Sequence, residues 1–130
     1  MDTLTVKVAA AVAAGGALGA VARLWVYTVV HGQFGRAFPY GTLVVNVVGS
    51  LAMGIAYVWL VERLSVSVEW RAFAVVGLLG AFTTFSAFSI ETLNLLADGA
   101  PLRALTNVAL NVGLCVLAAW AGVSGARWLS

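Results

Sequence analysis

The stretch GLLGAFTTFSAFSIE, residues Gly77 to Glu91, decides how this chain folds. It places two glycines, a Thr-Thr-Phe-Ser tetrapeptide and a carboxylate within an apolar run long enough to span a membrane. Gly80, Thr83 and Thr84 weaken helix continuity, and a broken helix in hydrocarbon leaves backbone carbonyls that need a partner. Such breaks are tolerated where they line a cavity or bind an ion. The stretch therefore predicts a protein that moves or holds ions.

The composition of the chain is that of an integral membrane protein. Of its 130 residues, 62% are hydrophobic and 9% are charged, too few charges to cover a soluble domain of this size. Charged residues lie largely between four apolar runs, residues 8 to 30, 39 to 61, 72 to 97 and 104 to 126. Each run can cross about 30 Å of hydrocarbon at about 1.5 Å per residue. We expect one all-α transmembrane domain, residues 1 to 130, with four helices of which the third is broken.

Several function classes lack support in the sequence. The net charge of +2 comes from scattered basic residues without a Lys/Arg run, so nucleic acid is not an expected partner. Cys115 is the single cysteine, which excludes an intramolecular disulfide and a cysteine-based metal cluster. The single histidine, His31, stands at a span end with no nucleophile or metal ligand near it in sequence. We therefore do not expect an enzyme.

Basic residues are almost evenly divided between the two sides of the predicted membrane domain. If both termini and the middle loop share a side, Lys7, Arg63, Arg71 and Arg127 stand against Arg23, Arg36 and Arg103. Because Lys/Arg asymmetry sets orientation, a chain this balanced can insert both ways. Insertion in both orientations would allow an antiparallel dimer.

One face of the first span carries two glycines followed by an arginine. Gly15, Gly19 and Arg23 are four residues apart on one helical face, and the two glycines form a close-approach motif. Arg23 lies about 12 Å inside the end of the span at His31, where an arginine costs about 2.5 to 3.5 kcal/mol. It could reach the interface, pair with Glu91, or attract an anion into an aqueous vestibule.

Polar side chains recur at helical spacing in the other spans. Thr42, Asn46, Ser50 and Gly54 form one stripe of the second span, which must face protein or water. The amide of Asn46 can donate two hydrogen bonds to an anion. The interpretation as plain helix–helix contact stays open for this stripe.

The third and fourth spans add aromatic, acidic and amide groups. Phe85, Phe88 and Glu91 step by three; phenylalanine rows usually face the core or lipid, but a ring edge is positive and can meet an anion. Glu91 is either a coupling carboxylate or a structural partner of Arg23. Asn107 and Asn111 are four residues apart and supply neutral donors that suit passage of a small ion, or a hydrogen-bonded helix interface. One chain of four helices cannot enclose these stripes and a broken-helix ion site, so we expect a homodimer.

Four motifs in order carry a resemblance over nearly the whole chain. They are GAVAR (Gly19 to Arg23), GTLVVNVVGS (Gly41 to Ser50), GLLGAFTTFSAFSIE, and NVALN (Asn107 to Asn111). Together they resemble the small fluoride channel family, Fluc or CrcB. The resemblance implies an antiparallel, dual-topology homodimer in the plasma (inner) membrane with two narrow fluoride-selective pores. It also implies a structural sodium ion at the dimer centre, held by the backbone carbonyls of Gly80 and Thr83 from both chains.

The same resemblance assigns pore roles. Phe85 and Phe88 match the pore phenylalanines, Asn46 the pore asparagine and Arg23 the vestibule arginine. The chain departs from the family's frequent residues at Ala81, Ala87 and in the fourth span; there we take Asn107 and Asn111 as pore-side residues and exclude Cys115. The expected track of neutral donors consists of Thr42, Asn46, Ser50, Thr84 and Ser86.

The expected function is passive fluoride efflux that protects against fluoride toxicity. Fluoride is strongly hydrated, so its pore must replace water with many neutral donors. A small proton-coupled multidrug or cation exporter of four spans is the first alternative; it needs an acid inside the membrane, for which Glu91 is the candidate. A non-transporting assembly subunit is the second.

Overall fold

The computed structural model describes residues 2 to 63 and 65 to 130, nearly all of them helical. The elements are α1 (Thr3–Phe34), α2 (Tyr40–Ala56), the π-helical η1 (Tyr57–Arg63), α3 (Val68–Arg71), the π-helical η2 (Ala72–Leu79), α4 (Gly80–Phe82), α5 (Phe85–Ala97) and α6 (Pro101–Trp128). They make up four spans long and apolar enough to cross a membrane: Thr3–Phe34, Tyr40–Arg63, Val68–Ala97 and Pro101–Trp128. The prediction of an all-helical, four-span chain is confirmed. The predicted run 39 to 61 begins one residue before its helix, and the other three lie inside theirs.

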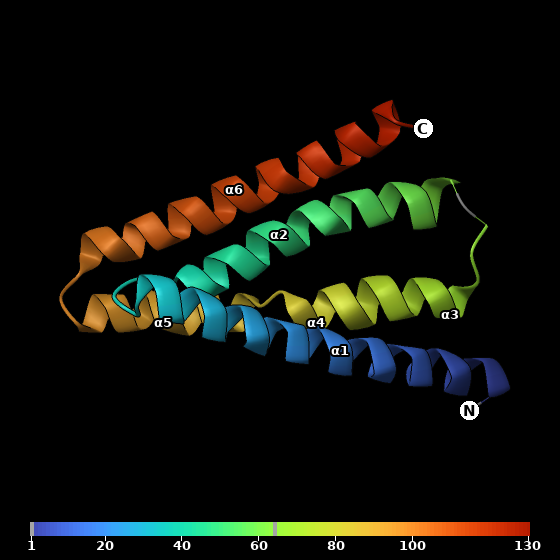
Figure 1. The fold of residues 1–130 in the computed structure, drawn as a ribbon, viewed down its shortest axis with the longest axis horizontal. Coiled ribbons are helices and arrows are strands. Elements are labelled where there is room, and N and C mark those ends of the chain that lie inside the picture. Colours follow the sequence, from blue (N-terminus) through green and yellow to red (C-terminus); the bar gives the residue numbers. More distant parts are fainter. Residues whose placement is uncertain (1, 64) are drawn as a thin grey trace.

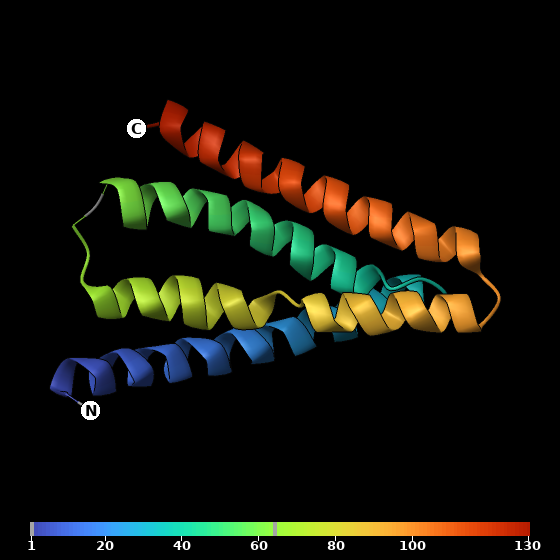
Figure 2. The ribbon, with the colours of Figure 1, turned by 180° about the vertical axis from the view of Figure 1, so that it is seen from behind.

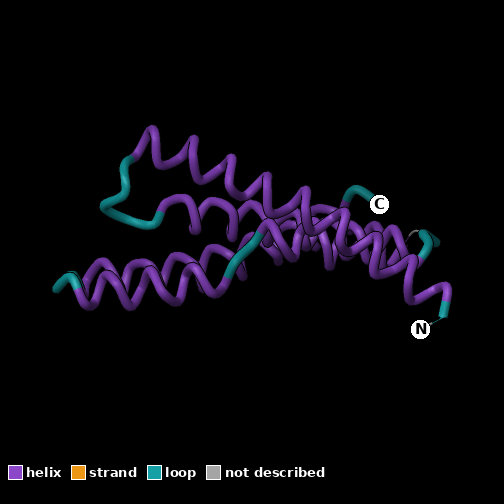
Figure 3. The backbone as a smooth tube through the Cα atoms, turned by 90° about the horizontal axis from the view of Figure 1, so that it is seen from below, coloured by secondary structure: helices purple, strands orange, loops and turns teal. Residues whose placement is uncertain are grey.

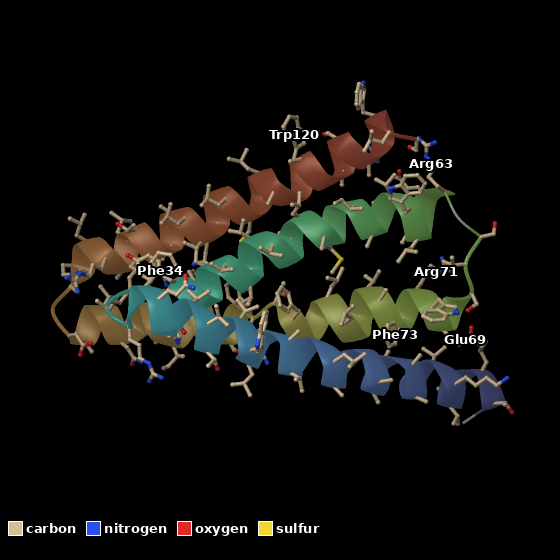
Figure 4. The ribbon with its side chains drawn as sticks, viewed as in Figure 1. Phe34, Arg63, Glu69, Arg71, Phe73 and Trp120 are labelled. Carbon is tan, nitrogen blue, oxygen red and sulfur yellow. The ribbon has the colours of Figure 1, made fainter. Side chains whose placement is uncertain are left out.

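The spans run back and forth, so the two ends of the bundle carry different connections. Both termini lie at one end together with the link between η1 and α3, and the links α1–α2 and α5–α6 lie at the other (Figure 1). Arg63, Glu69 and Arg71 gather at the end that holds the termini (Figure 4). This is the sidedness assumed in the count of basic residues.

Close backbone packing joins the first span to the third. The buried residues of α1 are Gly15 and Gly19. A methyl group on Gly15 would collide with the backbone oxygen of Phe73 in η2, and one on Gly19 with that of Leu78. The close-approach motif predicted from spacing therefore exists, and its partner is η2. Figure 2 shows α1 running alongside this part of the third span.

A second pair of glycines joins α2 to α6. A methyl group on Gly54 would meet the backbone oxygen of Ala119, and one on Gly122 would meet that of Leu51. The Gly54 end of the polar stripe thus faces α6. Large apolar side chains remain outside the bundle, for example Trp120, which is 67% exposed and points away from the other helices (Figure 4). Exposed apolar side chains of this kind suit contact with lipid or with another membrane-spanning helix.

Two residues without helical geometry separate α4 from α5. Thr83 has φ −84° and ψ 159°, and Thr84 has φ −153° and ψ 116°, both extended. Figure 3 shows this link as a loop between helical segments in the middle of a span. Gly80 keeps helical angles of φ −62° and ψ −38°, so the non-helical backbone is confined to the two threonines. Thr84 caps α5, because its Oγ1 accepts a 3.1 Å hydrogen bond from the N–H of Ala87.

Candidate functional site

Asn46 on α2 bonds to the backbone at the point where the helix is absent. Its Oδ1 accepts a 2.8 Å hydrogen bond from the N–H of Thr84, and its Nδ2 donates one of 3.1 Å to the carbonyl oxygen of Thr84. Both backbone groups therefore have partners although neither lies in a helix, as a low-dielectric environment demands. The second hydrogen of Nδ2 goes to Oδ1 of Asn111 at 3.0 Å. Both amide hydrogens that were expected to bind an anion are donated to protein atoms in this structure.

The two asparagines of α6 continue the network toward α5. Nδ2 of Asn111 donates to the backbone oxygen and to Oδ1 of Asn107, at 3.1 and 3.0 Å. Nδ2 of Asn107 donates to Oγ1 of Thr92 at 2.9 Å. Asn107 is 0% exposed and Asn111 5% exposed. The amides of the second and fourth spans thus form one connected group.

A cavity of about 400 Å³ lies beside this group. Six of the predicted pathway residues share its wall, namely Asn46, Ser50, Thr84, Phe85, Phe88 and Asn111. The rings of Phe85 and Phe88 are 5.2 Å apart and tilted by 55°. Phe85 is 76% exposed, whereas Phe88 is 8% exposed. Cys115, which was excluded from the predicted pathway, also lines this cavity, whereas Asn107 does not.

Arg23 faces a second hollow, of about 650 Å³, on the α1 side of α5. Ser86 and Thr84 line it too, and their hydroxyl oxygens are 3.3 Å apart. Thr84 belongs to both hollows. Arg23 and Ser86 therefore lie in the hollow on one side of Thr84, and Asn46 and Ser50 lie in the cavity on the other.

Thr42 connects α1 to the carboxylate of α5. Its hydroxyl, in a residue 1% exposed, donates to Oε1 of Glu91 at 2.8 Å. Since a hydroxyl has one hydrogen, the Tyr27 hydroxyl at 2.7 Å must be the donor of their shared bond. Tyr27 was not among the predicted site residues, although it lies four residues after Arg23 on the same helical row.

The pairing of Glu91 with Arg23, one of the alternatives left open, is not what the structure shows. Among the described residues, the ion pair is Glu62 with Arg127, which joins η1 to α6. Oε2 of Glu91 is buried and has no hydrogen-bond partner among them. Glu91 also lines a third cavity, about 800 Å³, whose wall includes His31, Arg36 and Arg103. It lies near the α1–α2 and α5–α6 links.

Backbone oxygens at the end of α4 are the metal-binding candidates. The N–H groups that would reach Gly80 and Thr83 in a continuous helix belong to Thr84 and Ala87, and these donate to side chains instead. In the described part of the chain, no hydrogen bond to the carbonyl oxygen of Gly80 or Thr83 is found. The same part holds no group of three His, Cys, Asp or Glu side chains able to bind a metal.

The fold and the site define a small multi-pass membrane protein with a polar network and cavities beside a helix interruption. Residues 10–123 match the family model for CrcB-like protein, Camphor Resistance (CrcB), and the chain belongs to this family. A Methylococcus capsulatus protein is 50% identical over 92% of this chain and 53% of its own length. Proteins of Alteromonas mediterranea (53% identical over 86% of this chain, 88% of its own length) and Coxiella burnetii (47%, 85% and 90%) are similar too. All three are named fluoride-specific ion channel FluC. The chain thus spans about half of the first relative and most of the other two.

Proposed function

We propose that this chain is a subunit of a fluoride-selective channel through which cytoplasmic fluoride leaves passively, protecting the cell against fluoride toxicity. The observation that carries the proposal is the cavity beside Thr84, where neutral amides, hydroxyls and two phenylalanine rings meet. Relatives about 50% identical carry the name of fluoride-specific ion channels. The family match, residues 10–123, includes every residue that lines this cavity.

The chemistry of the wall suits fluoride. A small anion loses much hydration free energy when it enters a narrow path, and neutral donors replace that hydration without holding the ion as tightly as a fixed cation. In the proposed path, Ser50, Thr84 and Ser86 offer hydroxyls, and the ring edges of Phe85 and Phe88 offer weakly positive hydrogens. Asn46 and Asn111 line the wall, with their amide hydrogens donated to Thr84, Asn111 and Asn107. Thr42 lies further along the same stripe, and Asn107 lies on the far side of Asn111 from Asn46. Arg23 raises the local anion concentration at the second hollow.

The working unit of this proposal is an antiparallel, dual-topology homodimer in the plasma (inner) membrane. Three observations support it: basic residues are balanced between the two ends, Phe85 in the cavity wall is 76% exposed, and Gly80 is exposed on the single chain. A second copy would cover the exposed ring and complete the wall. Closed two-fold assemblies are the commonest way for one chain to do this.

The link at Thr83 and Thr84 is, in the proposal, the break in the third span that holds sodium. Carbonyl oxygens that accept no hydrogen bond among the described residues, those of Gly80 and Thr83, are hard neutral ligands of the kind such cations prefer. The same two residues from a second copy would double the set. A bound sodium ion would satisfy these oxygens and fix the dimer centre.

Ion efflux from liposomes that contain the purified protein tests the proposed function. We expect rapid fluoride efflux under a potassium/valinomycin shunt, little chloride efflux, and no requirement for a proton gradient. Equal efflux of the two anions, or none of either, would contradict the proposal. Fluoride efflux that stops without a proton gradient would point to an exchanger instead of a channel.

A further inference from the structure

The hydrogen bonds behind Asn46 form a chain with a fixed direction, here called the amide relay: Thr92, Asn107, Asn111 and Asn46. It begins at a backbone carbonyl, because the Thr92 hydroxyl donates to the oxygen of Phe88 at 2.8 Å. With its hydrogen used, Thr92 can only accept from its other neighbour. That neighbour is Nδ2 of Asn107, at 2.9 Å.

Each later amide inherits its orientation from the one before. With Nδ2 of Asn107 turned to Thr92, its Oδ1 meets Nδ2 of Asn111 at 3.0 Å. Oδ1 of Asn111 then accepts from Nδ2 of Asn46 at 3.0 Å, and Oδ1 of Asn46 accepts from the N–H of Thr84 at 2.8 Å. Rotating any one amide by half a turn would oppose donor to donor or acceptor to acceptor.

Both ends of the relay lie on backbone groups whose polarity cannot change. A carbonyl oxygen only accepts and an N–H only donates. The hydrogen bonds between the carbonyl of Phe88 and the N–H of Thr84 can therefore run in only one direction. Thr84 and Phe88 are also the cap and an early residue of the same helix, α5. The relay therefore leaves α5, passes through α6 and α2, and returns to α5 at the interruption.

We propose that Asn107 and Thr92 are positioning residues that act through Asn111 on Asn46. Asn107 is fully buried, and neither residue lines the cavity that Asn46 borders. They hold the Asn46 oxygen toward the N–H of Thr84, which fixes the backbone of the interruption and decides which edge of the amide faces the cavity. The effect of these residues on fluoride rests on the proposed function; their effect on Thr84 does not.

The chain offers a closely matched control. The hydroxyls of Thr92 and Thr106 each donate to the carbonyl four residues earlier in their own helix, at 2.8 Å in both cases. Only the Thr92 hydroxyl also accepts from Asn107. Thr92→Val and Thr106→Val therefore remove the same hydroxyl and the same bond to the preceding turn, with and without the relay; Thr92 is half-buried and Thr106 is exposed.

The experiment measures amide hydrogen exchange at Thr84 by nuclear magnetic resonance on the full-length protein, without any transport assay. We expect exchange at Thr84 to be about fivefold faster or more in Thr92→Val and in Asn107→Leu, and unchanged in Thr106→Val. Fluoride efflux and fluoride-over-chloride selectivity should fall in the first two variants only. The double variant with both Asn107→Leu and Thr92→Val should accelerate exchange at Thr84 little more than either single variant does, since both substitutions interrupt the same relay.

The outcomes separate the relay from the proposed function. Thr84 exchange that stays at the wild-type rate in Thr92→Val overturns the relay, whatever Asn107→Leu does to the bundle. Exchange that is accelerated equally in Thr106→Val overturns it too. Exchange that changes as expected in a protein that passes no fluoride supports the relay and contradicts the channel assignment.

Discussion

The side chain of Asn46 bonds to both backbone polar groups of Thr84, accepting from the N–H at 2.8 Å and donating to the carbonyl oxygen at 3.1 Å. A carboxamide accepts and donates through two separate atoms, and its second amide hydrogen remains for Asn111. One residue of α2 thus supplies the acceptor that the N–H of Thr84 would find at Gly80 in a continuous helix, and adds a donor to the carbonyl oxygen of Thr84.

Replacing Asn46 by Asp should lower fluoride efflux at least tenfold. The carboxylate keeps an acceptor for the N–H of Thr84 but cannot donate to Thr84 or Asn111, and each lost partner costs about 1 to 3 kcal/mol. Its negative charge also repels the anion. Efflux from liposomes measures the loss. Asn94→Asp, on an exposed side chain of α5, adds the same charge outside the network and should leave most of the efflux; efflux retained in Asn46→Asp would place the path elsewhere.

Phe85→Ile and Phe88→Ile should both reduce fluoride efflux but differ in stability. Phe85 is 76% exposed on the single chain, so its replacement should change the unfolding free energy of the separated chain by less than about 0.5 kcal/mol and act mainly on assembly. Phe88 is 8% exposed, and a change of shape there should cost about 1 to 3 kcal/mol. Thermal unfolding and light scattering report stability and assembly beside the efflux assay. Wild-type efflux in both variants would mean that the rings do not border the path.

Glu91→Gln separates a channel from a proton-coupled exporter. The carboxamide oxygen can still accept from Thr42, whose bond to Glu91 is 2.8 Å, while the titratable proton is removed. We expect fluoride efflux to persist within about threefold, as measured in liposomes. Proton-coupled cation transport that is present in the wild type and abolished in Glu91→Gln would favour the exporter.

Gly15→Ala should destabilise the protein, whereas Gly16→Ala should not. A methyl group at Gly15 meets the backbone of η2, which cannot move aside as a side chain can, while one at Gly16 meets nothing within 4 Å. Overpacking of this kind costs about 1 to 3 kcal/mol, and Gly to Ala in a free helical position gains up to about 1 kcal/mol. Thermal unfolding in detergent compares the two. Equal midpoints of thermal unfolding in the two variants would show that α1 and η2 can move apart without a loss of stability.

The spans and the smooth face of the first span could be predicted because each depends on residues near in sequence. Hydropathy and length mark the helices, and the four-residue spacing of Gly15 and Gly19 marks a smooth face. The partners of that face could not be predicted, since Phe73 and Leu78 come from a different span. The same holds for Glu62 and Arg127, which are joined across the bundle.

Six of the predicted site residues share one cavity wall, but their hydrogen bonds to one another were not predicted. Polar spacing identified Asn46 and Asn111, yet the direction of an amide depends on the whole hydrogen-bond chain, which begins at Thr92 outside every motif. Tyr27 was missed because a single tyrosine in an apolar helix has no pattern. Cys115 lines the cavity because it lies four residues after Asn111, on the same face of α6. Its residue type alone gave no reason to place it there.

The extended residues Thr83 and Thr84 also shape the electric field of the third span. Peptide dipoles add along a helix, so about half a negative charge accumulates where α4 ends and about half a positive charge where α5 begins. These opposite poles stand back to back, separated by two residues, and arise from the backbone alone. A substitution that let the helix continue through Thr83 and Thr84 would cancel both poles together, even though it removed no charged side chain.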